Sequence, residues 1–120
     1  MQLTKNFKSS EFDSPDLPHS GKKMRIEFIS QLQYARDIAE IPFKINSGFR
    51  TKEHNQKVGG TINSSDLYGY ACDIHCNSDL DRFTIVNALL MAGFTRIGIA
   101  KTFIHVDSDP KKNSFRIWMY

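Results

Sequence analysis

The segment from Phe103 to Asp107, Phe-Ile-His-Val-Asp, alternates apolar and polar side chains. Successive side chains of a β-strand point to opposite faces of the sheet, so a strand here directs Ile104 and Val106 to one face and His105 and Asp107 to the other. The first face can enter a hydrophobic core, while the second carries an imidazole beside a carboxylate. This segment therefore predicts a strand that belongs both to the core and to a polar site.

A second segment, Ser64 to Asp73, also combines carboxylates with a strand. Asp66 and Asp73 flank Gly69, which allows a loop to turn back toward a strand, and the segment ends in the small and apolar residues typical of a strand that enters the core. With the His-x-Asp pair of the first segment, the two aspartates supply the mixed oxygen and nitrogen donors found in zinc sites. Aspartates in loops also serve as caps and turn formers, so this spacing alone leaves both interpretations open.

The rest of the chain predicts helices and further strands. Apolar residues at a spacing near three indicate an amphipathic helix between Met24 and Glu40. Cap residues at the start and glycines at the end indicate a short helix at 51–58 and a longer one that begins near Ser78 and stops at Gly93. Strands are expected at 43–47, 71–74, 96–100, 103–107 and 116–120. This order predicts an α+β fold, a single domain with a small, mainly antiparallel sheet and helices packed on one side.

The length of 120 residues suits one compact domain. We expect residues 1–23 to form an N-terminal arm, packed by its aromatic side chains on a domain of residues 24–120. The apolar residues expected in the core include Met24, Phe28, Phe83, Phe94 and Trp118.

The net charge of +3 comes from lysines and arginines scattered along the chain. No basic stripe with interleaved aromatics is present, so we expect no nucleic-acid partner. No apolar run is long enough for a signal peptide or a membrane span, so we expect no membrane partner and synthesis as a soluble cytoplasmic monomer. Cys72 and Cys76, four positions apart on one expected strand, would be about 13 Å apart and therefore free thiols. Cys72, His75 and Cys76 could be taken for a site that binds a soft metal ion, but the chain has no second pair of Cys or His residues at the spacing such a site needs.

Three motifs in order carry a resemblance to a known family. They are Ile45 to Gly60 (Ile-Asn-Ser-Gly-Phe-Arg-Thr-Lys-Glu-His-Asn-Gln-Lys-Val-Gly-Gly), Asn63 to Asp73, and Phe103 to Asp107. Over roughly residues 24–120 the chain resembles the zinc D-Ala-D-Ala carboxypeptidase family of peptidoglycan peptidases, and most of all its small bacteriophage-encoded members.

The resemblance implies a fold shared with the hedgehog signalling domain, a bound zinc ion, and hydrolysis of stem peptides of peptidoglycan at the bacterial cell wall. A metallopeptidase of this kind is either a carboxypeptidase that removes the terminal D-alanine or an endopeptidase that cuts within or between stems. A role as an endolysin in phage lysis, or in entry through the wall, would follow.

In the family's pattern, Ser-x-His-x-x-Gly-x-Ala-x-Asp, the histidine and the last aspartate bind zinc. Asp73 matches that aspartate, and Asp66 stands at the histidine position. The resemblance places the third ligand on the His-x-Asp strand, where either residue could bind the metal. We take His105 as the ligand because imidazole is the commoner zinc donor, which leaves Asp107 as the catalytic base or as a hydrogen-bond partner of the ligand.

Arg50 matches the arginine that lies near the substrate in family members. Its planar guanidinium can hold a terminal carboxylate or a peptide carbonyl. His54 and Asn55 also match the family, and we expect them to support the loop of Arg50 rather than to bind metal.

Asp66 leaves three outcomes open. A carboxylate can replace imidazole as a zinc ligand, although its charge makes the metal a weaker Lewis acid. His75, on the same strand face as Asp73, could substitute, or the site could be inactive. The alternative function is therefore a catalytically impaired or inactive cell-wall-binding homologue, natural or engineered.

Overall fold

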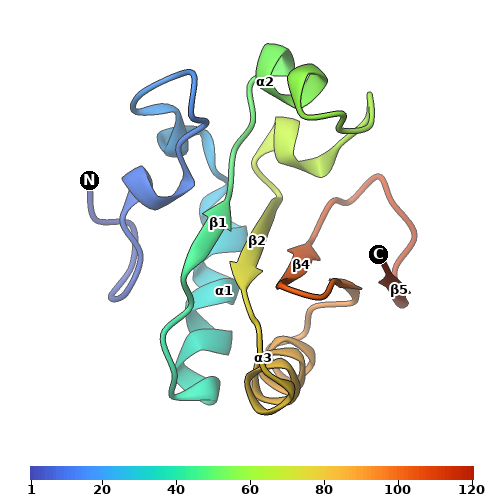
Figure 1. The fold of residues 1–120 in the computed structure, drawn as a ribbon. Helices are drawn as coiled ribbons and strands as arrows, with labels where there is room; N and C mark the ends of the chain where they lie inside the picture. Colours follow the sequence, from blue (N-terminus) through green and yellow to red (C-terminus); the bar gives the residue numbers. More distant parts are fainter.

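The computed structural model describes all of residues 1–120. Figure 1 shows a sheet with α-helices against it and short 3₁₀ helices in the connections. The elements in chain order are η1 (Ser9–Phe12), η2 (Ser20–Lys23), α1 (Ile26–Ala39), β1 (Ile45–Ser47), α2 (Lys52–Lys57), η3 (Ser65–Tyr68), β2 (Ala71–His75), α3 (Asp79–Met91), β3 (Arg96–Ile99), β4 (Phe103–Asp107) and β5 (Arg116–Met119). Every predicted helix and strand is present, and the predicted α+β fold class is confirmed.

The sheet has the strand order β1-β2-β4-β3-β5. All neighbouring strands are antiparallel except β3 and β5, which are parallel. β2 and β4 carry the two segments with the candidate ligands, and their register places Asp73 opposite His105 and Ala71 opposite Asp107. Because paired residues of neighbouring strands point to the same face, the candidate ligands of both strands share one face of the sheet.

The opposite face of the sheet forms the core with α1 and α3. Ile74, Ile104 and Val106 from the central strands are fully buried in one cluster with residues of both helices. The rings of Phe28 on α1 and Phe94, just after α3, meet edge to face at 5.7 Å between centroids. The helices thus cover one face and leave the other to the polar site.

Two apolar residues expected in the core lie elsewhere. Phe83 is 72% exposed, because the inward stripe of α3 is formed by Ile85, Ala88 and Leu89. Trp118 is half-buried, because its register with β3 places it on the polar face of the sheet rather than on the core face. A single aromatic residue at strand spacing does not reveal which face it occupies.

The N-terminal arm contributes to the same core as the rest of the chain. Phe7 and Phe12 are buried, and the N–H of Phe49 donates to the carbonyl of Phe12 at 2.9 Å. A Cβ atom on Gly48 would lie only 2.7 Å from Cα of Phe12, so the backbones touch at this point. We propose that residues 1–23 act as an arm of the domain formed by residues 24–120 rather than as a separate unit.

None of the helices has the length and apolar character needed to cross a membrane. Cys72 and Cys76 are both free, as predicted, and both are fully buried.

Candidate functional site

Asp66 is fixed by the short helix η3, where the sequence predicted only a loop. The hydroxyl of Ser64 caps this helix by accepting from the N–H of Asp66 at 3.2 Å, and it donates to Oδ2 of Asp66 at 3.0 Å. The N–H of Arg50 donates to the carbonyl of Asp66 at 3.0 Å. The turn before β2 and the segment after β1 therefore hold each other, and Asp66 is only 4% exposed.

Asp73, His105 and Asp107 form one chain of hydrogen bonds. Nδ1 of His105 lies 2.9 Å from Oδ1 of Asp73, and Nε2 lies 2.9 Å from Oδ2 of Asp107. The antiparallel register of β2 and β4 produces the first contact, and the two-residue repeat of β4 produces the second. All three side chains are buried, so both nitrogens of the imidazole are held by carboxylates away from solvent.

Arg50 lies across the two aspartates that the sequence predicted as ligands. Its Nη1 is 3.5 Å from Oδ2 of Asp66, and its Nη2 is 4.0 Å from Oδ2 of Asp73. Nη1 also donates to Oδ1 of Asn55 at 3.3 Å, so α2 supports the arginine as expected. Two buried polar atoms are left without a hydrogen-bond partner, Nε of Arg50 and Oδ1 of Asp66. Buried polar groups are rarely unpaired, so each of these atoms can take a further partner, Nε of Arg50 as a donor and Oδ1 of Asp66 as an acceptor.

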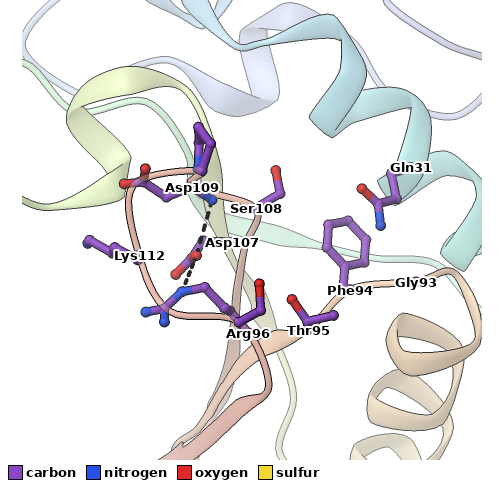
Figure 2. Close-up of a pocket in the computed structure, with 11 residues that line it drawn as sticks. Gln31, Gly93, Phe94, Thr95, Arg96, Asp107, Ser108, Asp109 and Lys112 are labelled. Atoms are coloured by element: carbon purple, nitrogen blue, oxygen red, sulfur yellow. Dashed lines mark hydrogen bonds and ion pairs between the residues drawn. The ribbon is translucent and has the colours of Figure 1, made fainter.

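Arg96 is a site residue that the sequence reasoning missed. Its Nε donates to Oδ1 of Asp107 at 2.7 Å, and its Nη1 donates to the carbonyl of Asn113 at 2.6 Å. Figure 2 shows the guanidinium and the N–H of Asp109 approaching the same carboxylate, the latter at 3.4 Å. The only available signal was an arginine at the start of a predicted strand, which gives no partner.

A second missed contact ties the end of β4 to η3. The hydroxyl of Ser65 donates to Oδ2 of Asp109 at 2.9 Å, and both residues are buried. The residue before Asp66 is thereby linked to the segment that follows Asp107. The same segment lines a small polar cavity of about 160 Å³ beside Arg96, shown in Figure 2.

The predicted site residues line one open pocket of about 430 Å³, a size typical of ligand sites. Arg50, Asp66, Asp73, His105 and Asp107 all contribute to it. The candidate substitute ligand does not, because His75 is exposed at the end of β2 and lies outside the pocket.

Burial and charge shift the acid–base equilibria of this cluster. Burial raises the pKa of Asp66 above its ordinary value, against the opposing effect of the Arg50 guanidinium. Burial alone would lower the pKa of His105, but the hydrogen bonds to Asp107 and Asp73 outweigh it and raise the pKa from 6.5 to about 9. Burial also opposes ionisation of Asp107, yet His105 and Arg96 hold the pKa of that carboxyl below its ordinary value. At neutral pH the imidazole is therefore a cation between carboxylates.

In this arrangement no three side chains of His, Cys, Asp and Glu are placed together as a metal-binding group. Both nitrogens of His105 are engaged by carboxylates, and Arg50 lies beside both Asp66 and Asp73, so hydrogen bonds and ion pairs hold these side chains.

An open pocket lined by three buried carboxylates, an imidazole and arginines gathers the acid–base and cationic groups of an enzyme site. A comparison with protein families supports that class, because the model of the family described as peptidase M15 matches residues 3–107. The chain therefore belongs to the peptidase M15 family, as its sequence motifs predicted, and its class is that of a peptidase. No curated protein sequence matched the chain.

The raised pKa of His105 predicts how the stability of the metal-free protein depends on pH. A histidine whose pKa is higher in the folded state stabilises the fold fully below its unfolded value of 6.5, and this contribution is lost as the pH rises toward 9. We expect the free energy of unfolding, measured with urea in the presence of a chelator, to fall by up to about 3 kcal/mol over this range. The His105→Gln variant should show a flatter dependence, and equal slopes for the two proteins would contradict the assignment.

Proposed function

We propose that this protein is a zinc-dependent peptidase that hydrolyses stem peptides of peptidoglycan at the bacterial cell wall. The single observation that carries the proposal is the convergence of Asp66, Asp73, His105 and Arg50 on one pocket in a chain of the peptidase M15 family. We further propose a role in phage lysis or wall entry, on the resemblance of the sequence motifs to those of small phage-encoded members.

We propose that Asp66, Asp73 and His105 hold the zinc ion. Two carboxylates and an imidazole are ordinary zinc donors, and the unpaired buried oxygen of Asp66 is a carboxylate atom available to a cation. These donor atoms are of the type that zinc prefers. Binding requires that His105 lose its proton and that one of its hydrogen bonds be replaced by a bond to the metal. Zinc affinity should accordingly rise with pH below about 9. When bound, zinc supplies a Lewis acid that polarises the scissile carbonyl and lowers the pKa of water.

The remaining residues act around that centre. Asp107 accepts from Nε2–H of His105, so Nδ1 is the nitrogen that would bind the metal once it gives up its hydrogen bond with Asp73. Because both of its oxygens are already bonded and it is buried, its geometry supports this orienting role more than that of the base that takes the proton of the attacking water. Arg50 would hold the carboxylate or a carbonyl of the substrate once its contacts with Asp66 and Asp73 are released.

A second candidate function is cell-wall binding without hydrolysis. The observation that favours it is the aspartate at position 66, which pairs with Arg50 where the family pattern has a histidine. In this case the pocket would keep its affinity for stem peptides while hydrolysis would be lost.

The test is the zinc content of protein purified without chelator, together with hydrolysis of purified peptidoglycan and of a synthetic pentapeptide that ends in D-alanyl-D-alanine. About one zinc per chain with release of D-alanine or of cross-linked fragments supports the proposed function. Zinc near zero even after its addition, with peptidoglycan still bound in a pull-down, would establish the binding function instead. A protein that holds no zinc and does not bind peptidoglycan would overturn both candidate functions.

Replacement of Arg50 should have opposite effects on catalysis and on metal binding. Arg50→Ala removes the group that holds the substrate, so kcat/KM for stem peptides should fall about 100-fold. The same change removes a positive charge beside Asp66 and Asp73, so zinc should bind at least as tightly. Arg50→Lys, which keeps the charge without the planar fork, should restore little of the rate. Loss of zinc from Arg50→Ala would instead show that the arginine is structural.

A further inference from the structure

The C-terminal strand β5 contributes to the candidate site, although it lies outside the region matched by the family model. The match ends at residue 107, whereas β5 comprises Arg116–Met119. Trp118 of this strand and the following Tyr120 nevertheless line the same pocket as His105. Part of the pocket is therefore built by residues outside the matched region.

The register of three strands explains how Trp118 reaches His105. Gly98 on β3 pairs with His105 on β4 and with Trp118 on β5, so all three residues face the same side of the sheet. The imidazole and the indole are 5.6 Å apart between ring centroids, and the guanidinium of Arg96 lies 5.1 Å from the indole centroid. Trp118 thus borders His105, one of the proposed zinc ligands, and Arg96, which pairs with Asp107.

The glycine between these residues makes room for the aromatic side chains. A Cβ atom on Gly98 would lie 2.7 Å from Nε1 of Trp118 and 2.7 Å from Cε2 of Tyr120. Because Gly98 has no Cβ atom, the indole of Trp118 and the phenol of Tyr120 can lie directly over the backbone of β3. The ring of Tyr120 also packs on Phe103 at 5.2 Å between centroids. We call Phe103, Trp118 and Tyr120 the aromatic wall.

The aromatic wall faces a pocket whose other lining residues are mostly polar, with Val58 as the aliphatic exception. Arg50, Ser64 and Asp66 line other parts of the same pocket, and they offer charge and hydrogen bonds. The wall offers aromatic surface, with Tyr120 67% exposed and Trp118 half-buried. Such surfaces bind C–H-rich faces of ligands, either aliphatic side chains or the faces of sugar rings. A substrate that fills the pocket would present a polar end to Arg50 and an apolar face to the wall.

We propose that the aromatic wall is a substrate subsite, in which Trp118 and Tyr120 bind a C–H-rich face of the substrate close to the bond that is cut. This inference rests on the proposed function, because it names the residues that bind one part of the proposed peptidoglycan substrate. The face can come from an aliphatic side chain of the stem peptide or from the sugar attached to it. The subsite favours substrates with such a face over peptides of equal charge that lack one.

Trp118 is the only tryptophan in the chain, so its fluorescence reports directly on the wall. The experiment is a stopped-flow titration of the zinc-supplemented protein with two probes, a synthetic stem pentapeptide and the same peptide linked to N-acetylmuramic acid. Calorimetry with the same probes measures binding independently of the fluorophore. A saturable change in emission with the pentapeptide supports the subsite and assigns it to a peptide side chain, whereas a change with the glycopeptide alone supports it and assigns it to the sugar.

Variants separate a role in binding from a role in folding. Tyr120→Ala removes an exposed ring at the end of the chain and should weaken binding about fivefold by calorimetry. Trp118→Phe should weaken it less than Trp118→Ala. Met119→Ala is the matched control, because this side chain is 73% exposed and points to the opposite face of β5, and it should bind as the parent does.

Two results would overturn the inference and are distinguishable. Probes that bind by calorimetry but leave the emission of Trp118 and the affinity of Tyr120→Ala unchanged would overturn the subsite alone. Probes that do not bind by calorimetry at all would overturn the proposed function, and the subsite with it.

Discussion

Replacement of Asp107 by asparagine should lower kcat/KM for stem-peptide hydrolysis by about 100-fold or more and should weaken zinc binding in parallel. The variant keeps the shape of the side chain but changes what faces His105. Oδ1 of the asparagine can still accept from Nε of Arg96, which in the parent donates to Asp107 at 2.7 Å. The amide NH₂ then faces Nε2 of His105, which must become an acceptor. The proton is consequently held on Nδ1, the nitrogen that faces Asp73 and that we propose binds the metal.

The measurements are the zinc dissociation constant and the rate of peptide hydrolysis at saturating zinc. Glu27→Gln is the matched control, since it also removes one carboxylate charge but lies exposed in the first turn of α1. It should match the parent in both measurements. Unchanged zinc affinity in Asp107→Asn would show that this carboxylate does not set the protonation of His105, and a loss of rate alone would return Asp107 to the role of catalytic base.

The sequence predicted the fold well because its strands and helices carry strong local signals. The alternation in Phe103 to Asp107 assigned His105 and Asp107 to one face correctly, and it also sent Ile104 and Val106 into the core. Caps and glycines placed the helix ends within a few residues. These features depend on neighbours along the chain, which a sequence displays directly.

The contacts that set the chemistry of the site depend instead on residues distant in the sequence. Nothing local shows that Arg96 pairs with Asp107, because that pairing requires β3 to lie beside β4 in a particular register. The prediction that Trp118 lies in the core was wrong for the same reason, because the parallel pairing of β5 with β3 decides which face of the sheet it occupies. The ion pair between Arg50 and Asp66 likewise follows from how the segment after β1 meets η3.

Asp66 is the position where sequence pattern and structure together make the sharpest prediction. The family pattern has a histidine here, and the structure shows the aspartate buried, paired with Arg50 at 3.5 Å and left with one oxygen unpaired. The charge of this carboxylate serves two partners, since it neutralises Arg50 and would also neutralise part of the charge on a bound zinc. A more neutral metal is a weaker Lewis acid, so the aspartate should limit the rate even when zinc is bound.

Asp66→His should therefore bind zinc about tenfold more tightly and hydrolyse stem peptides about tenfold faster than the parent, because an imidazole donates to the metal without adding charge. Asp66→Asn is the matched control, since it removes the same charge but supplies a poor zinc donor. If Asp66 is a ligand, the asparagine variant should lose zinc while the histidine variant gains affinity. If the carboxylate acts only through its charge on Arg50, the two variants should behave alike. Equal rates for parent and Asp66→His with zinc in excess would show that position 66 does not limit hydrolysis. The limit on the rate would then lie in the hydrogen bonds of His105 with Asp73 and Asp107, which compete with metal binding.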